Sequence, residues 1–373
     1  MKKTLLISVG LLIASTIAQA QNVNIPDANF KAYLVGNTSI NTNSDSEIQV
    51  SEAAAFNGTI NCGSLSISDL TGIEAFTNLT ELYCLDNSLT TLNTSQNINL
   101  TTLYCNSNNL ASIDLSQNIS LVELSVAYNN LTTIDISNNT LLSIFYGTHN
   151  QLSSIDVTQN TNLTELDFGY NSISGTVDVS QNTILTHLQC YNNSLSSLDV
   201  SQNTSLINLN FRNNNISDLD ITQNTSLEIL RCSNNDLSIL KTIYTSTLVN
   251  LDASLNPNLT CIEVDDTSAA NSSLNYLIDA TASYSLDCNY ILNINDFELA
   301  KSISIYPNPA TSEISIISDK IIESIELIDV FGKVIKSSLN PNNTIYVSNL
   351  SNGLYFLQVH TKKGLAIKKF IKD

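Results

Sequence analysis

One asparagine recurs through the middle of this 373-residue chain at nearly constant spacing, and it constrains the fold more than any other feature. Successive copies are 21 residues apart, except for one step of 22 near Gly175. A fixed period of this size is typical of a solenoid, in which each structural unit stacks only on its neighbours. The nine copies are Asn87, Asn108, Asn129, Asn150, Asn171, Asn193, Asn214, Asn235 and Asn256.

Each unit also has leucines that alternate with other residues just before the asparagine. Two clear copies are "LTTLYCNSNNLASIDLSQN" and "LVELSVAYNNLTTIDISNN". The alternation predicts a short strand with one buried face, which a single unit cannot cover but stacked units can share. We expect the asparagine amide to be buried and to bind backbone groups at the bend after the strand.

The pattern L-x-x-L-x-[CVF]-x-x-N-x-L resembles the leucine-rich repeat, in the short form of internalin-like bacterial surface proteins. The resemblance implies an α/β-type leucine-rich-repeat solenoid with a curved parallel β-sheet, built from nine 21-residue repeats over residues 78–256. The resemblance also implies that residues 21–77 form an N-terminal cap that ends in an entry repeat. Residues 257–288 are expected to form a C-terminal cap, because the ends of a solenoid otherwise expose its core.

Seven cysteines fall into two groups. Cys84, Cys105, Cys190 and Cys232 share one inward strand position, where we expect small apolar core residues, and Cys62 extends that column. The other two, Cys261 and Cys288, lie outside the periodic scheme and flank a short segment after the last repeat. They are the candidate disulfide of the C-terminal cap.

Residues 1–20 have two lysines, an apolar run and an Ala-Gln-Ala end, the pattern of a secretory signal peptide. Export permits a disulfide. No other apolar run reaches the roughly 18–20 residues needed to cross a bilayer.

Residues 21–300 carry 28 acidic and 4 basic side chains, which argues against nucleic acid or an anionic membrane as partner. Residues 301–373 carry 9 basic and 6 acidic side chains, so the composition changes near residue 300.

The segment from Asn41 to Glu52, in the N-terminal cap, resembles a degenerate EF-hand calcium loop. Asn41, Asn43 and Asp45 stand at loop positions 1, 3 and 5, Glu47 at 7 and Glu52 at 12. Calcium needs several hard oxygens and a bidentate carboxylate that closes the loop, so the spacing predicts weak, structural calcium binding.

The loop departs from the EF-hand pattern at two positions. Asn41 replaces the usual Asp, and Ser46 replaces the Gly of the sharp turn. The alternative is therefore a polar turn that caps the following helix without a metal.

A second column of polar residues lies on the return side of the repeat, which is the segment that leads from the bend after one strand back to the next strand. It comprises Asp114, Asp135, Asp156, Asp178, Asp199 and Asp220, with Asn93 at its head. Stacked carboxylates repel unless they are paired or hydrogen-bonded. We expect each Asp to cap the turn that follows it; the alternative is a ladder that binds cations.

The strand positions that point away from the core form the concave face, which is the usual ligand face in the family that the repeat resembles. Tyrosine and arginine are common in recognition hot spots, and both of the chain's arginines fall on this face. The candidate ligand-binding residues are Tyr83, Tyr104, Tyr146, His187, Tyr191, Arg212 and Arg231. The alternative is that these residues only suit a half-buried strand surface in an acidic protein.

The C-terminal segment changes to alternating strands with turn residues between them, an all-β pattern. Residues 303–373 resemble the type A C-terminal sorting domain of the type IX secretion system, after a linker over residues 289–302. The resemblance implies a small β-sandwich read by the secretion machinery. Its motifs are Tyr306-Pro307-Asn308-Pro309-Ala310, Asp329-Val330-Phe331-Gly332-Lys333, Leu350-Ser351-Asn352-Gly353-Leu354-Tyr355 and the basic end "KKFIKD".

No enzyme motif is present: the sequence has no G-x-S-x-G, no H-E-x-x-H and no Gly-rich phosphate loop. We expect a non-catalytic, adhesin-like binding protein with an extracellular protein or glycan as ligand. It would be exported through the periplasm to the surface or medium of a Gram-negative bacterium. The alternative is a structural or surface-layer spacer without a specific ligand.

Overall fold

The computed structural model describes residues 21–242, 247–288, 299, 301–330, 333–339, 343–361 and 364–373. Its contacts divide the chain into two compact units, one up to Cys288 and one from Asn289. The predicted signal segment 1–20 and most of the predicted linker 289–302 lie outside the described residues. None of the helices in the described ranges is long and apolar enough to cross a membrane.

The first unit begins with two short helices, α1 (Ala28–Gly36) and α2 (Val50–Ala55). Asp27 caps the start of α1, because its carboxylate accepts hydrogen bonds from the N–H groups of Asn29 and Phe30. Phe30 is fully buried and belongs to the same apolar core as the repeats. The cap therefore covers one end of that core.

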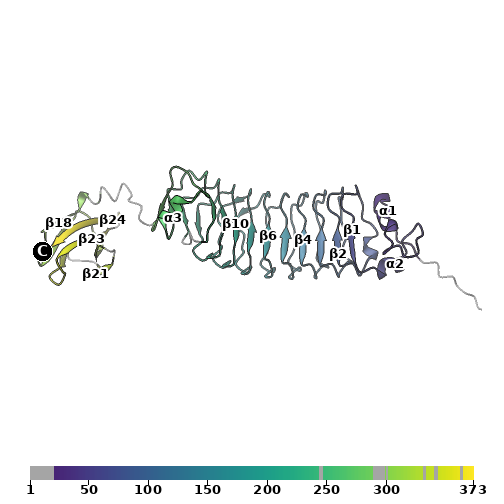
Figure 1. The fold of residues 1–373 in the computed structure, drawn as a ribbon, viewed down its shortest axis with the longest axis horizontal. Coiled ribbons are helices and arrows are strands. Elements are labelled where there is room, and N and C mark those ends of the chain that lie inside the picture. Colours follow the sequence, from purple (N-terminus) through teal and green to yellow (C-terminus); the bar gives the residue numbers. More distant parts are fainter. Residues whose placement is uncertain are drawn as a thin grey trace, which may run out of the picture. The chain divides into compact units, whose positions relative to one another are not determined.

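One sheet of eleven strands runs along the first unit (Figure 1). Its neighbouring strands are parallel and in register, with Leu82 opposite Leu103 and Leu103 opposite Leu124. These leucines have no solvent exposure, so the predicted parallel sheet with one buried face is confirmed. The strands are β1 (Thr59–Asn61), β2 (Glu81–Tyr83), β3 (Thr102–Tyr104), β4 (Glu123–Ser125), β5 (Ile144–Tyr146), β6 (Glu165–Asp167), β8 (His187–Gln189), β10 (Asn208–Asn210), β12 (Ile229–Arg231), β14 (Asn250–Asp252) and β16 (Tyr276–Leu277).

The recurring asparagines form the expected buried ladder at the bend after each strand. Asn129 is typical: its Nδ2 donates to the carbonyl of Cys105 in the preceding repeat and to those of Val126 and Ala127 in its own. Its Oδ1 accepts from the N–H of Leu110, again in the preceding repeat. Each amide thus joins two repeats and leaves little of the bend's backbone without a partner.

The return side has the predicted aspartate caps. Each Asp of the column accepts a hydrogen bond from the N–H two residues on, as Asp114 does from Ser116 at 2.9 Å. These hydrogen bonds lower the pKa of all six carboxyls, with Ser116 as the main cause for Asp114. The structure therefore supports turn caps and not a cation ladder.

A second asparagine column, which was not predicted from the sequence, lies next to these caps. Asn118 is typical: its Nδ2 donates to the carbonyls of Thr94 and Asn97 in the preceding repeat. The column is almost fully buried and comprises Asn97, Asn118, Asn139, Asn160, Asn182, Asn203 and Asn224.

Towards the C-terminal end of the unit the return side becomes a second parallel sheet, made of four strands. They are β11 (Asp218–Asp220), β13 (Ile239–Lys241), β15 (Cys261–Glu263) and β17 (Ser283–Ser285). Earlier in the chain the one-residue insertion forms the short pair β7 (Ser174–Gly175) and β9 (Ser194–Leu195). Gly175 has φ of +76°, a backbone conformation that glycine adopts without strain.

The cysteines separate as predicted. Cys62, Cys84, Cys105, Cys190 and Cys232 are buried in the core as free thiols. Cys261 and Cys288 form a disulfide with Cα atoms 5.7 Å apart, in the terminal segment that also holds α3 (Thr267–Ser272).

The second unit contains two antiparallel sheets, as the all-β pattern predicts. Asn308 of the first motif accepts a hydrogen bond from the N–H of Ile371 and donates to the carbonyl of Lys369, which ties this motif to the last strand. Phe331 and Gly332 of the second motif lie outside the described residues. The strands are β18 (Ser304–Tyr306), β19 (Glu313–Ile317) and β22 (Thr344–Tyr346) in one sheet, and β20 (Ile322–Ile328), β21 (Val334–Leu339), β23 (Gly353–Thr361) and β24 (Gly364–Lys372) in the other.

The asparagine ladder leads to a first prediction. Asn129→Ala should lower the free energy of unfolding by about 2–4 kcal/mol, because it leaves buried backbone groups of two repeats without partners. The matched control is Asn130→Ala, since the neighbouring side chain is exposed and its loss should change stability by less than about 0.5 kcal/mol. Both values come from chemical denaturation, and equal midpoints for the two variants would contradict the role of the ladder.

Candidate functional site

The candidate site is the sheet face, defined as the side chains of the eleven-stranded sheet and its flanking turns that point away from the core. All seven residues predicted from the sequence lie on it or directly after one of its strands. The strands from β2 to β6 carry four carboxylates and neither lysine nor arginine on this face. They are Glu81, Glu123, Glu165 and Asp167.

The tyrosines of the strands are held by each other and by these carboxylates. The rings of Tyr83 and Tyr104 meet edge to face with centroids 5.3 Å apart. The Tyr104 hydroxyl donates to Glu123 of the next repeat at 2.9 Å, and burial together with this bond raises the pKa of Tyr104 to about 12. Tyr146 donates in the same way to Glu165. Each tyrosine is therefore oriented before any ligand arrives, which lowers the entropy lost on binding.

The C-terminal part of the face holds the remaining predicted residues. Tyr191 lies against Gly169, where a Cβ would come within 2.6 Å of its ring, so the glycine makes room for the tyrosine. The guanidinium carbon of Arg212 lies 5.2 Å from the centre of that ring. Arg231 lies on β12, and His187 lies on β8 with its Nδ1 3.0 Å from the Thr186 hydroxyl. Among the described residues, neither arginine forms an ion pair with a carboxylate.

Three further aromatic residues, which were not predicted from the sequence, lie in the flanking turns of this face. Tyr128, His149 and Tyr170 each stand one residue before a ladder asparagine, in a turn with φ between 48° and 56°. The His149 ring stacks between the other two, with centroid distances of 4.1 Å on both sides. Tyr170 then meets Tyr191 edge to face at 5.4 Å.

We call this run the aromatic ladder: Tyr128, His149, Tyr170 and Tyr191, ending at Arg212. Tyr128 is 53% exposed and Tyr170 is 44% exposed, so the ladder is a surface feature. Comparing the repeats at the position before the asparagine would have revealed it, because three consecutive repeats there carry an aromatic residue.

Asp167 is a strand carboxylate of the sheet face with a raised pKa. Its Oδ1 accepts a 2.9 Å hydrogen bond from the Gly169 N–H, and this is the only hydrogen bond seen for its side chain within the described ranges. Burial raises the pKa of Asp167 to about 6, against the weaker opposing effect of that hydrogen bond. A partly desolvated carboxylate without a cationic partner destabilises the folded state when it is ionised. Carboxylates with such perturbed pKa values are common in functional sites.

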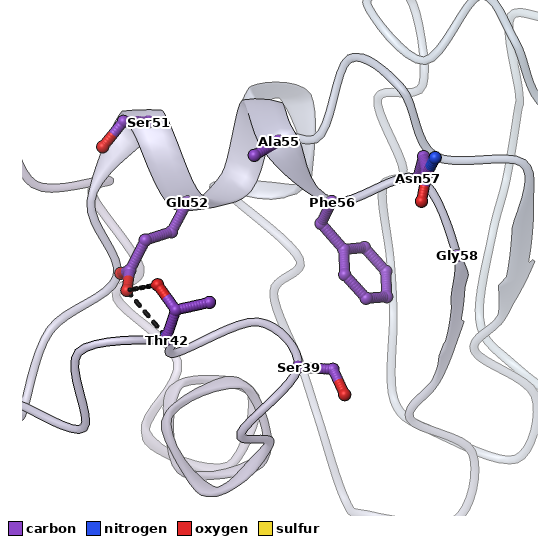
Figure 2. A pocket seen from close by; sticks show the side chains of 8 residues that line it. All are labelled: Ser39, Thr42, Ser51, Glu52, Ala55, Phe56, Asn57 and Gly58. Carbon is purple, nitrogen blue, oxygen red and sulfur yellow. Dashed lines mark hydrogen bonds between the residues drawn. The ribbon is translucent and has the colours of Figure 1, made fainter.

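The predicted calcium loop is closed by its own hydrogen bonds. The Oε1 of Glu52 accepts from the N–H and hydroxyl of Thr42 and from the N–H of Asn43, and its Oε2 accepts from the N–H of Gln49. Glu52 and Gln49 also form the capping box of α2. Figure 2 shows the Glu52 carboxylate bonded to Thr42 on one side of a hollow of about 440 Å³, with the Phe56 ring on the other side.

The other predicted ligands of the loop are also engaged. Glu47 pairs with Lys31 through both carboxylate oxygens, at 2.7 and 2.8 Å. Asp45 accepts from the N–H of Glu47 and from the side-chain amides of Asn43 and Gln49. The carboxylate oxygens of the loop are therefore bound by donors of the protein itself.

The buried Asn41 is the exception in this loop, because its Oδ1 has no hydrogen-bond partner. Within the described residues no three His, Cys, Asp or Glu side chains lie close enough together to hold a metal ion. The arrangement fits the capping alternative, and calcium binding stays a prediction.

The fold and site together define the class: a leucine-rich-repeat solenoid with an aromatic and acidic sheet face, followed by a separate β-sandwich. Residues 304–373 match the family described as the secretion system C-terminal sorting domain. A solved structure of the functional domain of InlJ from Listeria monocytogenes, described as including a cysteine ladder, is similar over 95% of this chain and 100% of its own. Its sequence identity is 25% and its TM-score 0.57.

A second solved structure, the internalin InlF from Listeria monocytogenes, matches with 19% identity and a TM-score of 0.45. That match covers 73% of this chain and 94% of the internalin. No curated protein sequence matches the chain. The likeness to the InlJ domain shows that the first unit is an internalin-like leucine-rich-repeat solenoid, and the sorting domain marks the chain for export.

Asp167 leads to a second prediction. Its raised pKa means that the folded state binds the proton of Asp167 more tightly than the unfolded state does. The protonated Asp167 therefore contributes its full stabilisation of the fold below about pH 4, and this stabilisation is lost as the pH rises through about 6. Asp167→Asn should therefore raise the free energy of unfolding by about 1–2 kcal/mol near pH 7 and leave it unchanged near pH 4. Denaturation at both pH values measures this, and a destabilised variant near pH 7 would contradict it.

Glu52 leads to a third prediction. Burial tends to raise its pKa, but hydrogen bonds from Gln49, Thr42 and Asn43 outweigh this and lower it. Its contribution is therefore present near neutral pH and lost as the pH falls through the lowered pKa. Glu52→Ala, measured in a chelator, should destabilise the solenoid by about 1–3 kcal/mol near neutral pH. A variant as stable as the parent protein would contradict the capping role.

Calcium is tested separately, with Asp45→Asn, which keeps the Glu52 cap. If the loop binds calcium, millimolar calcium raises the melting temperature of the parent protein but not of this variant. Equal melting temperatures with calcium and with a chelator would leave the loop as a metal-free cap.

Proposed function

We propose that this chain is an exported, non-catalytic binding protein whose sheet face holds an extracellular protein or glycan. One observation carries the proposal: between β2 and β6 the face presents tyrosines whose hydroxyls are already held by carboxylates of the next repeat. Oriented aromatic side chains on a rigid sheet supply contact area at low entropic cost.

The resemblance of the first unit to internalins supports the same function by analogy of fold, which is a weaker argument than the site itself. The sorting domain supports delivery to the cell surface or the medium by the type IX machinery. The cysteine column offers no nucleophile, because complete burial raises the pKa of the Cys84 thiol and holds it uncharged.

A pull-down with the purified chain as bait, against host extracellular proteins and a glycan array, tests this proposal. Tyr104→Ala, Tyr146→Ala and Arg231→Ala should each weaken capture about 10-fold or more and change the melting temperature little, because all three lie on the sheet face. Ile119→Ala is the control, since this exposed side chain lies in a turn outside the face. Undiminished capture by all three variants would exclude the face, and no capture at all would favour the structural spacer.

A further inference from the structure

The aromatic ladder and the carboxylates next to it narrow the class of ligand. We propose that this part of the sheet face binds lysine or arginine side chains of a protein partner, with Tyr128 as the main cation-stacking position. This inference rests on the proposed function and chooses a basic polypeptide over a glycan.

The placement of the ladder is the first argument. A positive φ is uncommon outside Gly and is tolerated best by Asn, Asp and His. The other repeats have Asp86, Ser107, Asn192, Asn213, Asn234 or Leu255 at this offset, so tyrosine stands there only in the ladder. Tyr128 and Tyr170 keep the same backbone conformation and leave about half of each ring in solvent. Exposed aromatic rings at costly backbone positions contribute little to folding, which points to a role in binding.

The chain's own arginine supplies the second argument. Arg212 lies over Tyr191 at the C-terminal end of the ladder, at a distance typical of a cation–π contact. At the other end, the face of Tyr128 towards Ser107 carries no second ring or cation within the described part of the chain. Tyr128 therefore offers an aromatic face like the one that Tyr191 offers to Arg212, but no cation from the described ranges covers it.

Charge is the third argument. Glu123 lies on β4, the strand that leads into Tyr128, and Asp86 lies two repeats earlier in the column of Tyr128. Asp167 lies on β6, between β5, which leads into His149, and β8, which leads into Tyr191. It has no cationic partner among the described residues. Burial lowers the pKa of His149, so the ladder itself stays neutral near pH 7 and does not repel a cation. A guanidinium or ammonium group would find a ring face and carboxylates together.

The ladder suits a sugar less well. Sugars stack on free ring faces, but both faces of His149 are covered, and so is one face each of Tyr128 and Tyr170. Only ring edges remain along most of the ladder, whereas the free face of Tyr128 offers the negative side of a ring, which suits a cation. An anionic ligand is disfavoured by the four carboxylates between β2 and β6.

The test uses synthetic peptides of equal length in which every second residue is arginine, lysine or glutamate, the others being glycine and serine. Fluorescence anisotropy with the purified chain should show binding of the arginine and lysine peptides, weakened by salt, and none of the glutamate peptide. Tyr128→Ala should weaken binding by about 2- to 30-fold, whereas Tyr128→Phe, which keeps the ring, should bind as the parent protein does.

Ile119→Ala is again the control and should bind normally, and melting temperatures confirm that each variant is folded. If Tyr128→Ala binds the arginine peptide as tightly as the parent protein, the attraction is only that of the acidic body, and the proposal is wrong. Capture of a glycan through Tyr104 and Tyr146, without preference for basic peptides, would overturn this inference while the proposed function stands.

Discussion

The amide of the ladder asparagine is the interaction on which the rest of the solenoid depends. A chain that reverses direction every few residues leaves backbone groups at each bend that no regular secondary structure satisfies. Asn129 and its eight counterparts fill this need with hydrogen bonds that reach into the preceding repeat, as in the contact from Leu110 N–H to Asn129 Oδ1. The repeats are therefore coupled to their neighbours by polar contacts as well as by the shared leucine core, and the strand register follows from both.

This register turns a position in the repeat into a column on the surface. Side chains at the same offset in successive repeats lie about 4.8 Å apart, so like charges and like rings become neighbours. The return-side aspartates tolerate this because each is held by the turn that it caps, as Asp114 is by Ser116. On the sheet face Glu123 and Glu165 receive tyrosine hydroxyls, but Asp167 receives only a backbone N–H and keeps a raised pKa. The sheet face thus combines a carboxylate of raised pKa with the exposed rings of Tyr128 and Tyr170.

Much of the fold could be predicted, because it follows from the period of the repeat and, for the disulfide, from the two cysteines that lie outside that period. The parallel sheet, the buried asparagines, the core cysteines and the pair Cys261–Cys288 are all found in the structure. The second asparagine column was not predicted, although both of the quoted copies of the repeat end in its asparagine. A buried amide and an exposed one look alike in sequence, and only the closure of the return side shows that Asn118 has no access to solvent.

The alternation of leucines predicts the site in and just after its strands. The alternation of leucines is enough to place Tyr83, Tyr104 and Tyr146 on one face, because side chains of a strand point to opposite sides in turn. It says nothing of Tyr128, His149 and Tyr170, which lie in the turn where that alternation has ended. The sequence by itself therefore determined the solenoid, its register and the face that points outward. The tertiary structure alone decided which rings stack, which hydroxyl meets which carboxylate and which acid loses water, because those contacts form between side chains of different repeats.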